Sequence, residues 1–345
     1  MVFHADQLTD ASHTILGRVF WHAELGVTVF FLITGFLLYR PMFAAAVGDA
    51  PPTPTALFYW RRILRIVPAY WIALIVLAPL LIYAHPLGLA NILFVQIYRP
   101  AWTRSGIPPG WSVCVEMSFY LLLPVYARTL QGRWGTLDRL SRRRRELQLL
   151  AVLAVASLAF RELISVAGIS QYATDPLPGT LAWFCIGMSL AVISVHPHPA
   201  GRLHRIAEHP SWCWGAAAAV YALTSITLEE SEHSIVVFAA YGLIAALILL
   251  PIVLGTPVRF SGGRLLQTRV VAWLGLVSYG IYLYHYPIEQ HIHLHAGSTT
   301  ANLLLLGAIG AAAAVACGAL SYYIVERQAL RLKRAGAVAR LRRAS

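Results

Sequence analysis

Charged residues are scarce in this sequence. Of its 345 residues, 12% are Asp, Glu, Lys or Arg, while 58% are hydrophobic and the mean hydropathy is +0.63. An average soluble protein carries about twice that charged fraction. A soluble domain of this size could not bury so much apolar surface, because many of its residues must still face water. The composition therefore argues against a soluble enzyme, a disordered chain or a nucleic-acid-binding module, and it indicates an integral membrane protein.

Lysine is nearly absent as well. Lys333 is the single lysine, so the net charge of +12 comes almost entirely from arginine. A basic excess can attract nucleic acid, but in a protein that crosses the membrane several times it also marks the cytoplasmic loops. We expect no nucleic-acid partner, because the arginines concentrate in alternate loops.

Cysteine is rare, and no ligand spacing indicates a metal. The four cysteines stand singly in apolar stretches, at Cys114, Cys185, Cys213 and Cys317. Without a CxxC pair they are typical of small core residues, which argues against a disulfide framework or a zinc site. Three alternating histidines, His291, His293 and His295, have a spacing that matches no metal site. We therefore predict no metal site.

Long apolar runs, by contrast, are abundant. A helix needs about 20 apolar residues to cross roughly 30 Å of hydrocarbon. Nine runs reach or approach that length, over 24–43, 65–84, 111–130, 147–166, 178–195, 211–227, 235–254, 270–288 and 301–324. The shorter stretch Leu87–Tyr98 is typical of a re-entrant or interfacial segment. Lipid leaves no water for unpaired backbone groups, so we predict an all-α, polytopic helical bundle.

The arginines predict which loops face the cytoplasm. Most of them lie in loops that alternate along the chain and in the tail, over 44–64, 131–146, 196–210, 255–269 and 327–345. Because basic loops remain in the cytoplasm, we predict a multi-pass protein of a bacterial plasma membrane with a cytoplasmic C-terminus. Three regions follow: an external segment over 1–23, a transmembrane domain over 24–326 and a basic cytoplasmic tail over 327–345.

The first residues resemble the end of a helix. Met1–His4 opens the chain without a cleavable signal sequence. Nine spans with a cytoplasmic C-terminus would leave the N-terminus outside. We therefore expect a further span upstream of Met1, which would bring the transmembrane helices to ten.

Glu116 is the only carboxylate well inside a predicted span. Helical spacing places it on one face with Ser112 and Tyr120, one turn before and one turn after it. Ionisable groups are costly in lipid, so each of them is a functional hypothesis. Glu116 could also pair with an arginine and lock two helices together, and the sequence leaves both interpretations open.

Two further groups of polar residues suit a substrate. Ser278, Tyr282 and His285 follow one another at steps of four and three and share a helix face. Arg62 and Arg65 lie three apart at the cytoplasmic mouth of a span, where two guanidinium groups suit a phosphate or pyrophosphate. The alternatives are a capped histidine at the interface and plain cytoplasmic anchoring.

Together these segments resemble the acyltransferase 3 family of membrane O-acyltransferases. Five motifs follow in the family's order, over Gly26–Phe36, Arg61–Arg65, Trp111–Tyr120, Leu274–Pro287 and Glu326–Arg327. His4 aligns with the family's essential histidine, whereas the arginine that precedes that histidine by eleven residues would lie upstream of Met1.

The resemblance implies transfer of an acyl group, with acetyl expected, from cytoplasmic acyl-CoA to a hydroxyl of a carbohydrate or glycolipid acceptor. Acyl-CoA is then a co-substrate, and no tightly bound cofactor is expected. His4 is the implied base and Glu116 would orient or stabilise its imidazole, while Arg62 and Arg65 would hold the CoA phosphates. The implied substrate-binding residues are Trp111, Ser112, Tyr120, Ser278, Tyr282 and His285.

The predicted depths of these residues in the membrane suggest a direction for the transfer. Glu116 and His285 fall in the outer half of their spans, whereas Arg62 and Arg65 fall at the inner mouth. The sequence therefore favours transfer across the membrane, from a cytoplasmic donor to an external or lipid-linked hydroxyl.

Two other functions remain open. One is a transporter or flippase of a lipid-linked glycan, with Glu116 and His285 as a proton relay, although no inverted repeat is visible in the hydropathy. The other is an inactive, truncated homologue.

Overall fold

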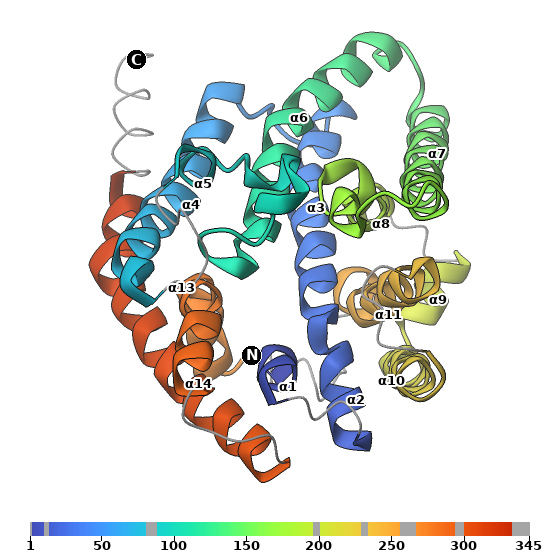
Figure 1. Cartoon of the computed structure of the whole chain (residues 1–345). Helices are drawn as coiled ribbons and strands as arrows, with labels where there is room; N and C mark the ends of the chain where they lie inside the picture. The colour runs from blue at the N-terminus through green and yellow to red at the C-terminus, as the bar shows by residue number, and fades with distance from the viewer. Residues whose placement is uncertain are drawn as a thin grey trace. The chain divides into compact units, whose positions relative to one another are not determined.

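The structure is a computed structural model, and helices are the regular secondary structure in the part of the chain that it describes (Figure 1). The described residues are 2–9, 14–80, 88–195, 201–228, 234–255, 267–293 and 300–332. Within these ranges helices alternate with turns and irregular connections, and no strand occurs. The prediction of an all-α fold is therefore confirmed.

The chain divides into two compact units, each assembled from separate stretches of sequence. The first comprises Met1–Gly17, Pro54–Cys114 and Gln267–Ser345, and the second comprises Arg18–Thr53 and Val115–Leu266. Two helices cross the boundary in sequence, α2 (Ile15–Trp21) and α6 (Trp111–Trp134). Nothing in the composition indicated this division, because apolar runs of the same length occur in both units.

The first unit is built around a pair of long helices. Its helices are α1 (Val2–Thr9), α4 (Thr55–Leu77), α5 (Leu89–Ile92), α13 (Arg269–His293) and α14 (Thr300–Ser321), which continues as a π-helical turn over Tyr322–Glu326. Helix α13 packs along α14, and the short α1 lies against both. Helix α4 packs on α13 and on the π-helical turn. The hydroxyl of Tyr279 donates to the carbonyl oxygen of Ile66 at 3.2 Å, which fixes the level at which α13 meets α4.

The second unit has α8 at its centre. Its helices are α3 (Leu25–Ala46), α7 (Arg139–Val166), α8 (Leu177–Val195), α9 (Arg202–Ala207), α10 (Pro210–Thr227) and α11 (Ile235–Leu254), together with most of α6. Helix α8 packs on α3, α7 and α11, and α10 packs on α11. An aromatic stack joins three helices of this core, because the ring of Phe184 stacks on those of Phe31 and Phe119 at centroid distances of 4.6 and 4.1 Å.

Where the structure describes them, the nine predicted spans fall on helices, but fewer of these helices are long and apolar enough to cross a membrane. Six stretches of the described chain are, namely Leu16–Ala46, Pro108–Trp134, Arg139–Val166, Gln171–Val195, Ile235–Leu254 and Leu303–Leu332. The predicted spans on α4, α10 and α13 stay predictions, and so does the total of nine. The segment Leu87–Tyr98 contains only short helical turns where it is described, in agreement with a stretch that does not span.

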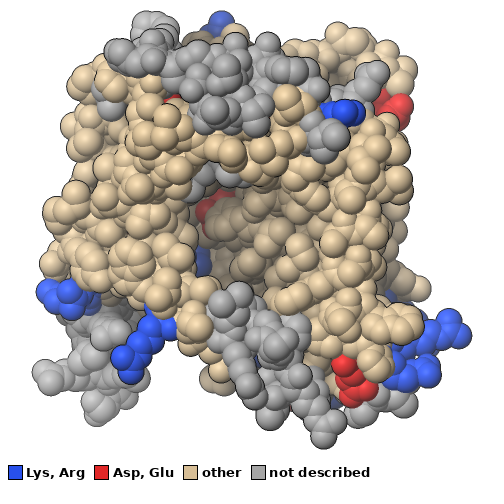
Figure 2. Space-filling model, turned by 90° about the horizontal axis from the view of Figure 1, so that it is seen from below, with Lys and Arg blue, Asp and Glu red and all other residues tan. Residues whose placement is uncertain are grey.

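The surface of these helices is largely apolar. Figure 2 shows a face on which most described residues are neither Lys or Arg nor Asp or Glu. Large hydrophobic side chains are exposed on several of the long helices, including Leu37, Ile75, Leu121 and Val155. Such exposure would be costly in water and is expected of a multi-pass membrane protein.

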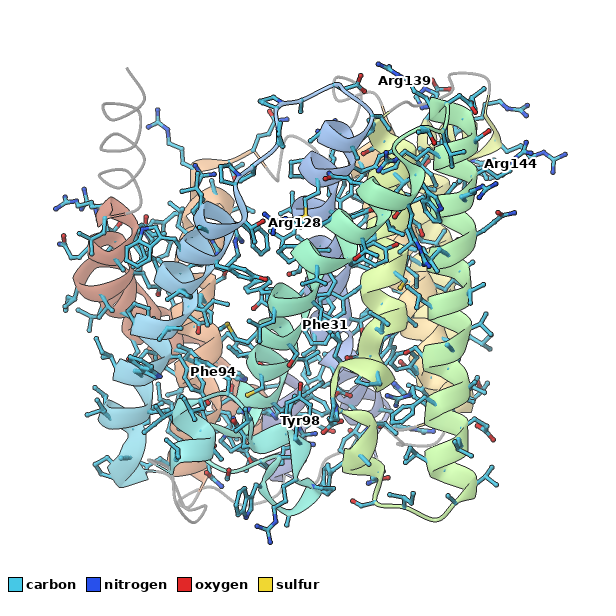
Figure 3. The ribbon with its side chains drawn as sticks, turned by 90° about the horizontal axis from the view of Figure 1, so that it is seen from above. Phe31, Phe94, Tyr98, Arg128, Arg139 and Arg144 are labelled. Carbon is cyan, nitrogen blue, oxygen red and sulfur yellow. The ribbon has the colours of Figure 1, made fainter. Side chains whose placement is uncertain are left out.

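Basic residues lie at one end of α7. Arg139 and Arg144 project from that end, away from the level of Phe31 in the middle of the unit (Figure 3). Asp138 caps the helix there by accepting the backbone N–H groups of Leu140 and Ser141, at 3.1 Å each. The Ser141 hydroxyl and these amides hold the pKa of Asp138 below its usual value.

A buried carboxylate ties three helices of the second unit together. The Glu146 side chain on α7 is completely buried, and its Oε1 accepts the hydroxyl of Tyr39 from α3 and that of Tyr126 from α6, the latter at 2.9 Å. Arg142, one turn earlier on α7, donates to the carbonyl oxygen of Ala46 at 3.1 Å. Such partners lower the free-energy cost of burying a polar group in apolar surroundings.

Glycine allows α3 and α8 to pack backbone against backbone. A Cβ atom at Gly187 would lie 2.1 Å from the carbonyl oxygen of Leu32, and one at Gly35 would lie 2.5 Å from that of Phe184. Small residues that permit such approach are the usual basis of helix packing in membranes, where no hydrophobic force draws helices together.

The close approach predicts a site-specific cost for a single methyl group. Gly187→Ala should destabilise the protein by about 1–3 kcal/mol or more, because the contacted atoms are backbone and cannot move aside. Gly215→Ala on α10 is the matched control, since no described atom lies within 4 Å of its Cβ position. The control should be neutral or stabilising by up to about 1 kcal/mol. Unfolding titrations in detergent would measure both, and equal stability of the two variants would contradict the packing described.

Candidate functional site

The first unit brings several predicted site residues together around His4. The His4 ring on α1 lies 5.1 Å from that of His285 and 4.6 Å from that of Tyr286, both on α13, measured between centroids. The ring of the adjacent Phe3 lies 4.8 Å from that of His4. His4 is partly buried and His285 is 3% exposed. Two histidines distant in sequence therefore share one packed environment.

The hydrogen bonds of the two imidazoles define their tautomers. Nδ1 of His4 lies 2.9 Å from Oε1 of Gln7, and Nδ1 of His285 lies 2.7 Å from the carbonyl oxygen of Tyr282. Both partner oxygens can only accept, so Nδ1 carries the proton in each ring. In the neutral imidazoles Nε2 is then the unprotonated nitrogen. Among the described residues neither Nε2 has a hydrogen-bond partner, so each ring keeps a basic nitrogen for another group.

The hydroxyl groups of Ser112 and Tyr282 are hydrogen-bonded to each other. The Ser112 Oγ lies 2.6 Å from the Tyr282 hydroxyl, and both hydroxyls also contact the carbonyl oxygen of Pro109. Sequence spacing placed these two residues in separate clusters, and the structure joins them at the start of α6. The ring of Trp111 beside them is 8% exposed, with the guanidinium of Arg104 above it at 5.0 Å from its centroid.

Ser278 is not part of this cluster. Its hydroxyl donates to the carbonyl oxygen of Gly275 at 3.0 Å within its own helix, and its side chain is exposed. Tyr282 and His285 do lie together, with ring centroids 5.7 Å apart. The predicted polar wall of α13 thus consists of the tyrosine and the histidine without the serine.

The arginine pair lies on α4 in the same unit. The Arg62 guanidinium lies 6.0 Å from the ring centroid of Phe58, one turn earlier. Arg65 is exposed and interacts electrostatically with Glu326, which is buried in the π-helical turn at the end of α14 and also accepts the hydroxyl of Ser321 at 3.4 Å. Two motifs far apart in the sequence thus meet through Arg65 and Glu326.

Glu116 belongs to the second unit and has partners there. Its Oε1 accepts the hydroxyl of Tyr120, one turn later on α6, and that of Thr34 on α3 at 3.5 Å. Glu116 is 4% exposed and Tyr120 is 3% exposed. Glu116 and Tyr120 therefore share a helix face, as predicted, and Thr34 is an additional partner of Glu116. His4 and Glu116 lie in different units, so the pairing of these two residues stays a prediction.

The structure also places residues that the sequence reasoning missed. Of these residues, Gln7 would have been the simplest to identify from the sequence, because a glutamine three residues after a histidine lies on the same helix face. Tyr286 lies within the late motif but was not considered as a neighbour of His4. Residue spacing could not identify Glu289, because a carboxylate at the end of a predicted span is expected to be exposed to water.

Glu289 is a buried carboxylate without a hydrogen bond. Its side chain is 0% exposed, and neither oxygen has a hydrogen-bond partner among the described residues. It lies one helical turn after His285 and faces α14, where Gly310 leaves room for it; a Cβ there would come within 2.7 Å of the Glu289 Cγ. Burial of a polar group without partners costs free energy, so this position is one at which stability is not optimised.

The arrangement suits proton transfer and the binding of an anionic group. In the described part of the chain, no group of three or more His, Cys, Asp or Glu side chains is placed to hold a metal ion. An imidazole with a fixed Nδ1–H and an available Nε2 can remove a proton from a hydroxyl group. Two arginines on the same unit can hold an anionic group such as a phosphate.

Comparisons with known proteins point to acyl transfer. A family model described as an acyltransferase domain matches residues 1–323. The peptidoglycan O-acetyltransferase OatA of Listeria monocytogenes is 24% identical over 292 residues, which cover 76% of this chain and 44% of that protein. Nodulation protein 10 of Rhizobium leguminosarum is 23% identical, over 89% of this chain and 82% of its own length.

A third relative is similar over a shorter region. The exopolysaccharide production protein ExoZ of Rhizobium meliloti is 32% identical over 35% of this chain and 37% of that protein. The chain spans less than half of the length of the peptidoglycan O-acetyltransferase. No solved structure matches the chain.

The two buried glutamates predict opposite effects of the same substitution. Glu289→Met should stabilise the protein by about 1–3 kcal/mol, because it removes a buried group without hydrogen bonds. Glu146→Met should destabilise it by a similar amount, because two tyrosine hydroxyls lose their acceptor. Unfolding of both variants in the same detergent would compare them. Destabilisation by Glu289→Met would indicate that this carboxylate has a stabilising partner.

Proposed function

This chain belongs to the acyltransferase 3 family, and on that premise we propose that it is a membrane O-acyltransferase. It transfers an acyl group, with acetyl expected, from cytoplasmic acyl-CoA to a hydroxyl of a carbohydrate or lipid-linked acceptor. The observation that carries this proposal is the geometry of the His4 ring. Its Nδ1 is hydrogen-bonded to Gln7, and within the described part of the chain its Nε2 remains to accept a proton. The names of the relatives, a peptidoglycan O-acetyltransferase and an exopolysaccharide production protein, favour a carbohydrate acceptor.

His4 acts as the base in this mechanism. Its Nε2 removes the proton of the acceptor hydroxyl while the oxygen attacks the carbonyl carbon of the thioester. A carbon–oxygen bond forms, the carbon–sulfur bond breaks, and the proton passes from the imidazolium to the departing CoA thiolate. Atoms and charge balance without a further reactant, so no tightly bound cofactor is required. His285, in contact with the His4 ring, completes the wall of the site.

Arg62 and Arg65 hold the phosphates of the donor. Guanidinium groups bind phosphate oxygens through charge-assisted hydrogen bonds, often two at a time. The contact of Tyr279 with Ile66 places Arg65 near the level of Tyr279 on α13. His285 follows Tyr279 by six residues, or about 9 Å of helical rise. The pantetheine arm of CoA is long enough to cover that separation, which supports a donor anchored at the arginines and reacting near the histidines.

Glu116 supports the reaction from α6. Because Gln7 is hydrogen-bonded to Nδ1 of His4, we assign Glu116 the role of stabilising the charged form of the catalytic imidazole through its negative charge. Tyr120 and Thr34 donate to Glu116 and hold its side chain in one conformation. A group that must act at a fixed position gains from such support.

The donor site is tested by removing each arginine. Arg62→Ala and Arg65→Ala should raise the KM for acetyl-CoA about tenfold or more, since each loses charge-assisted hydrogen bonds of roughly 1.5–3 kcal/mol. Arg144→Ala, an exposed arginine on α7, is the matched control and should leave the KM unchanged. Release of CoA thiol by proteoliposomes, with peptidoglycan fragments or exopolysaccharide as acceptors, provides the assay. An unchanged KM in the double variant would assign both arginines to membrane anchoring, and transport of a glycan without CoA release would favour a transporter.

Glu116→Gln separates a catalytic role from a structural one. The amide keeps an oxygen for the Tyr120 hydroxyl, so folding should survive, while the lost charge should lower acylation by about two orders of magnitude or more. If Glu116 serves mainly to lock helices, thermal stability should fall first and activity per folded molecule should remain. Comparing turnover with the amount of folded protein distinguishes the two results, and full turnover by a folded variant would remove Glu116 from the mechanism.

A further inference from the structure

The hydrogen bond between His4 and Gln7 has a consequence for the chemistry of the histidine. Both residues lie on α1, three positions apart, and Oε1 of Gln7 is 2.9 Å from Nδ1 of His4. A neutral imidazole carries one proton, which can sit on either nitrogen. Only one of these tautomers leaves Nε2 able to remove a proton from a hydroxyl group.

We propose that Gln7 is a positioning residue that keeps the proton of neutral His4 on Nδ1 and thereby presents Nε2 to the acceptor hydroxyl. The proposal rests on the role of His4 as the base in the proposed function. Gln7 is assigned no contact with the donor or the acceptor. It acts through His4, as the third residue of a catalytic triad acts through its histidine.

The chemistry of the amide supports this role. An amide oxygen only accepts hydrogen bonds, so its position beside Nδ1 is compatible with a proton on that nitrogen and not with a lone pair. An amide in this position orients the ring without adding a negative charge, as the asparagine does in the Cys-His-Asn arrangement of papain-like proteases. Neutral orientation leaves the stabilisation of the imidazolium to other charged groups.

The packing around His4 supports it as well. The rings of Phe3, His285 and Tyr286 enclose the imidazole and restrict its plane. A ring held only by such contacts can still turn by half a turn about its Cβ–Cγ bond, which exchanges the positions of its nitrogen and carbon atoms. The directional bond to Gln7 distinguishes the two orientations, which ring contacts alone do not.

Several titratable or charged groups surround this pair and share its electrostatics. His285 and Tyr286 contact the His4 ring from α13, and Arg104 interacts with it electrostatically from the segment before α6. Asp6 lies buried two residues along α1, and Glu289 lies one turn beyond His285. None of these residues is itself replaced in a Gln7 variant.

The experiment reads the tautomer and the activity separately. The full chain labelled with ¹⁵N-histidine is studied by NMR in detergent, and the signals of His4 are those lost in His4→Ala. Gln7→Leu should convert the single Nδ1–H tautomer into a mixture and lower kcat about tenfold or more with the KM for acetyl-CoA unchanged. Gln148→Leu, at an exposed glutamine on α7, is the matched control and should change neither.

Gln7→Glu provides the conservative rescue. A carboxylate also only accepts, so the Nδ1–H tautomer should be retained and most of kcat with it. Its charge stabilises the imidazolium, and a base must be unprotonated to act, so the pH profile of kcat should move to higher pH. A purely structural role of Gln7 would not move this profile. If Gln7→Leu unfolds, the NMR signals and the pH profile of Gln7→Glu still test the proposal.

Two results would overturn the inference, and they have different meanings. An unchanged Nδ1–H signal in Gln7→Leu, or in Gln7→Glu a pH profile that does not move, would show that Gln7 does not position His4. A tautomer that changes in Gln7→Leu while kcat stays constant would show that His4 is not the base. The first outcome leaves the proposed function intact, whereas the second removes the role of His4 from it.

Discussion

The need to satisfy polar groups inside an apolar bundle is the constraint on which this structure depends. A buried donor or acceptor without a partner costs free energy comparable to a whole hydrogen bond, and neither lipid nor packed side chains supply a replacement. Glu146 meets this need at Oε1 with the hydroxyls of Tyr39 and Tyr126, whereas its Oε2 has no hydrogen-bond partner among the described residues. Glu116 meets it with Tyr120 and Thr34. Each carboxylate thereby links neighbouring helices. The free-energy cost of burying it is reduced when these helices pack against one another, which favours this packing.

Close backbone approach is the second element of this recognition. Gly35 and Gly187 bring α3 and α8 together at distances that no other residue would permit. The same contact aligns Phe184 of α8 with Phe31 of α3, whose rings stack. Glycine therefore does more here than tolerate a turn, because it sets the separation at which the aromatic core and the hydroxyl of Thr34 meet their partners.

The sequence predicted the helices well and their grouping poorly. Apolar runs of about 20 residues identified each long helix, because the length of a span is imposed by the membrane and is visible locally. The start of α4 at Thr55 was missed by ten residues, since Arg61 and Arg62 interrupt the apolar run although the backbone continues as a helix. The division into two units was not predictable, because it depends on contacts between distant segments such as α1 with α13.

The candidate site was predicted in part for the same reason. Spacing along one helix identified the shared face of Glu116 and Tyr120, and the match of the family model confirmed the resemblance that rested on five motifs. Spacing failed for Ser278, whose hydroxyl returns to its own helix. It could not reveal that Ser112 meets Tyr282, since 170 residues separate them. Helical periodicity reports the faces of one helix and contains no information on which faces meet.

The hydrogen bonds divide the motif residues into two kinds. Ser112, Tyr282 and Tyr279 have their hydroxyls bonded to each other or to backbone carbonyls, so a large part of their role is to fix where α13 meets α4 and the start of α6. His4 and His285 each use Nδ1 for a hydrogen bond, and within the described part of the chain Nε2 remains for another group. Chemistry requires atoms that packing has not already satisfied. The hydrogen-bonded hydroxyls thus form a frame beside His4 and His285. In the proposed mechanism, a motif residue can contribute through that frame without contacting a substrate.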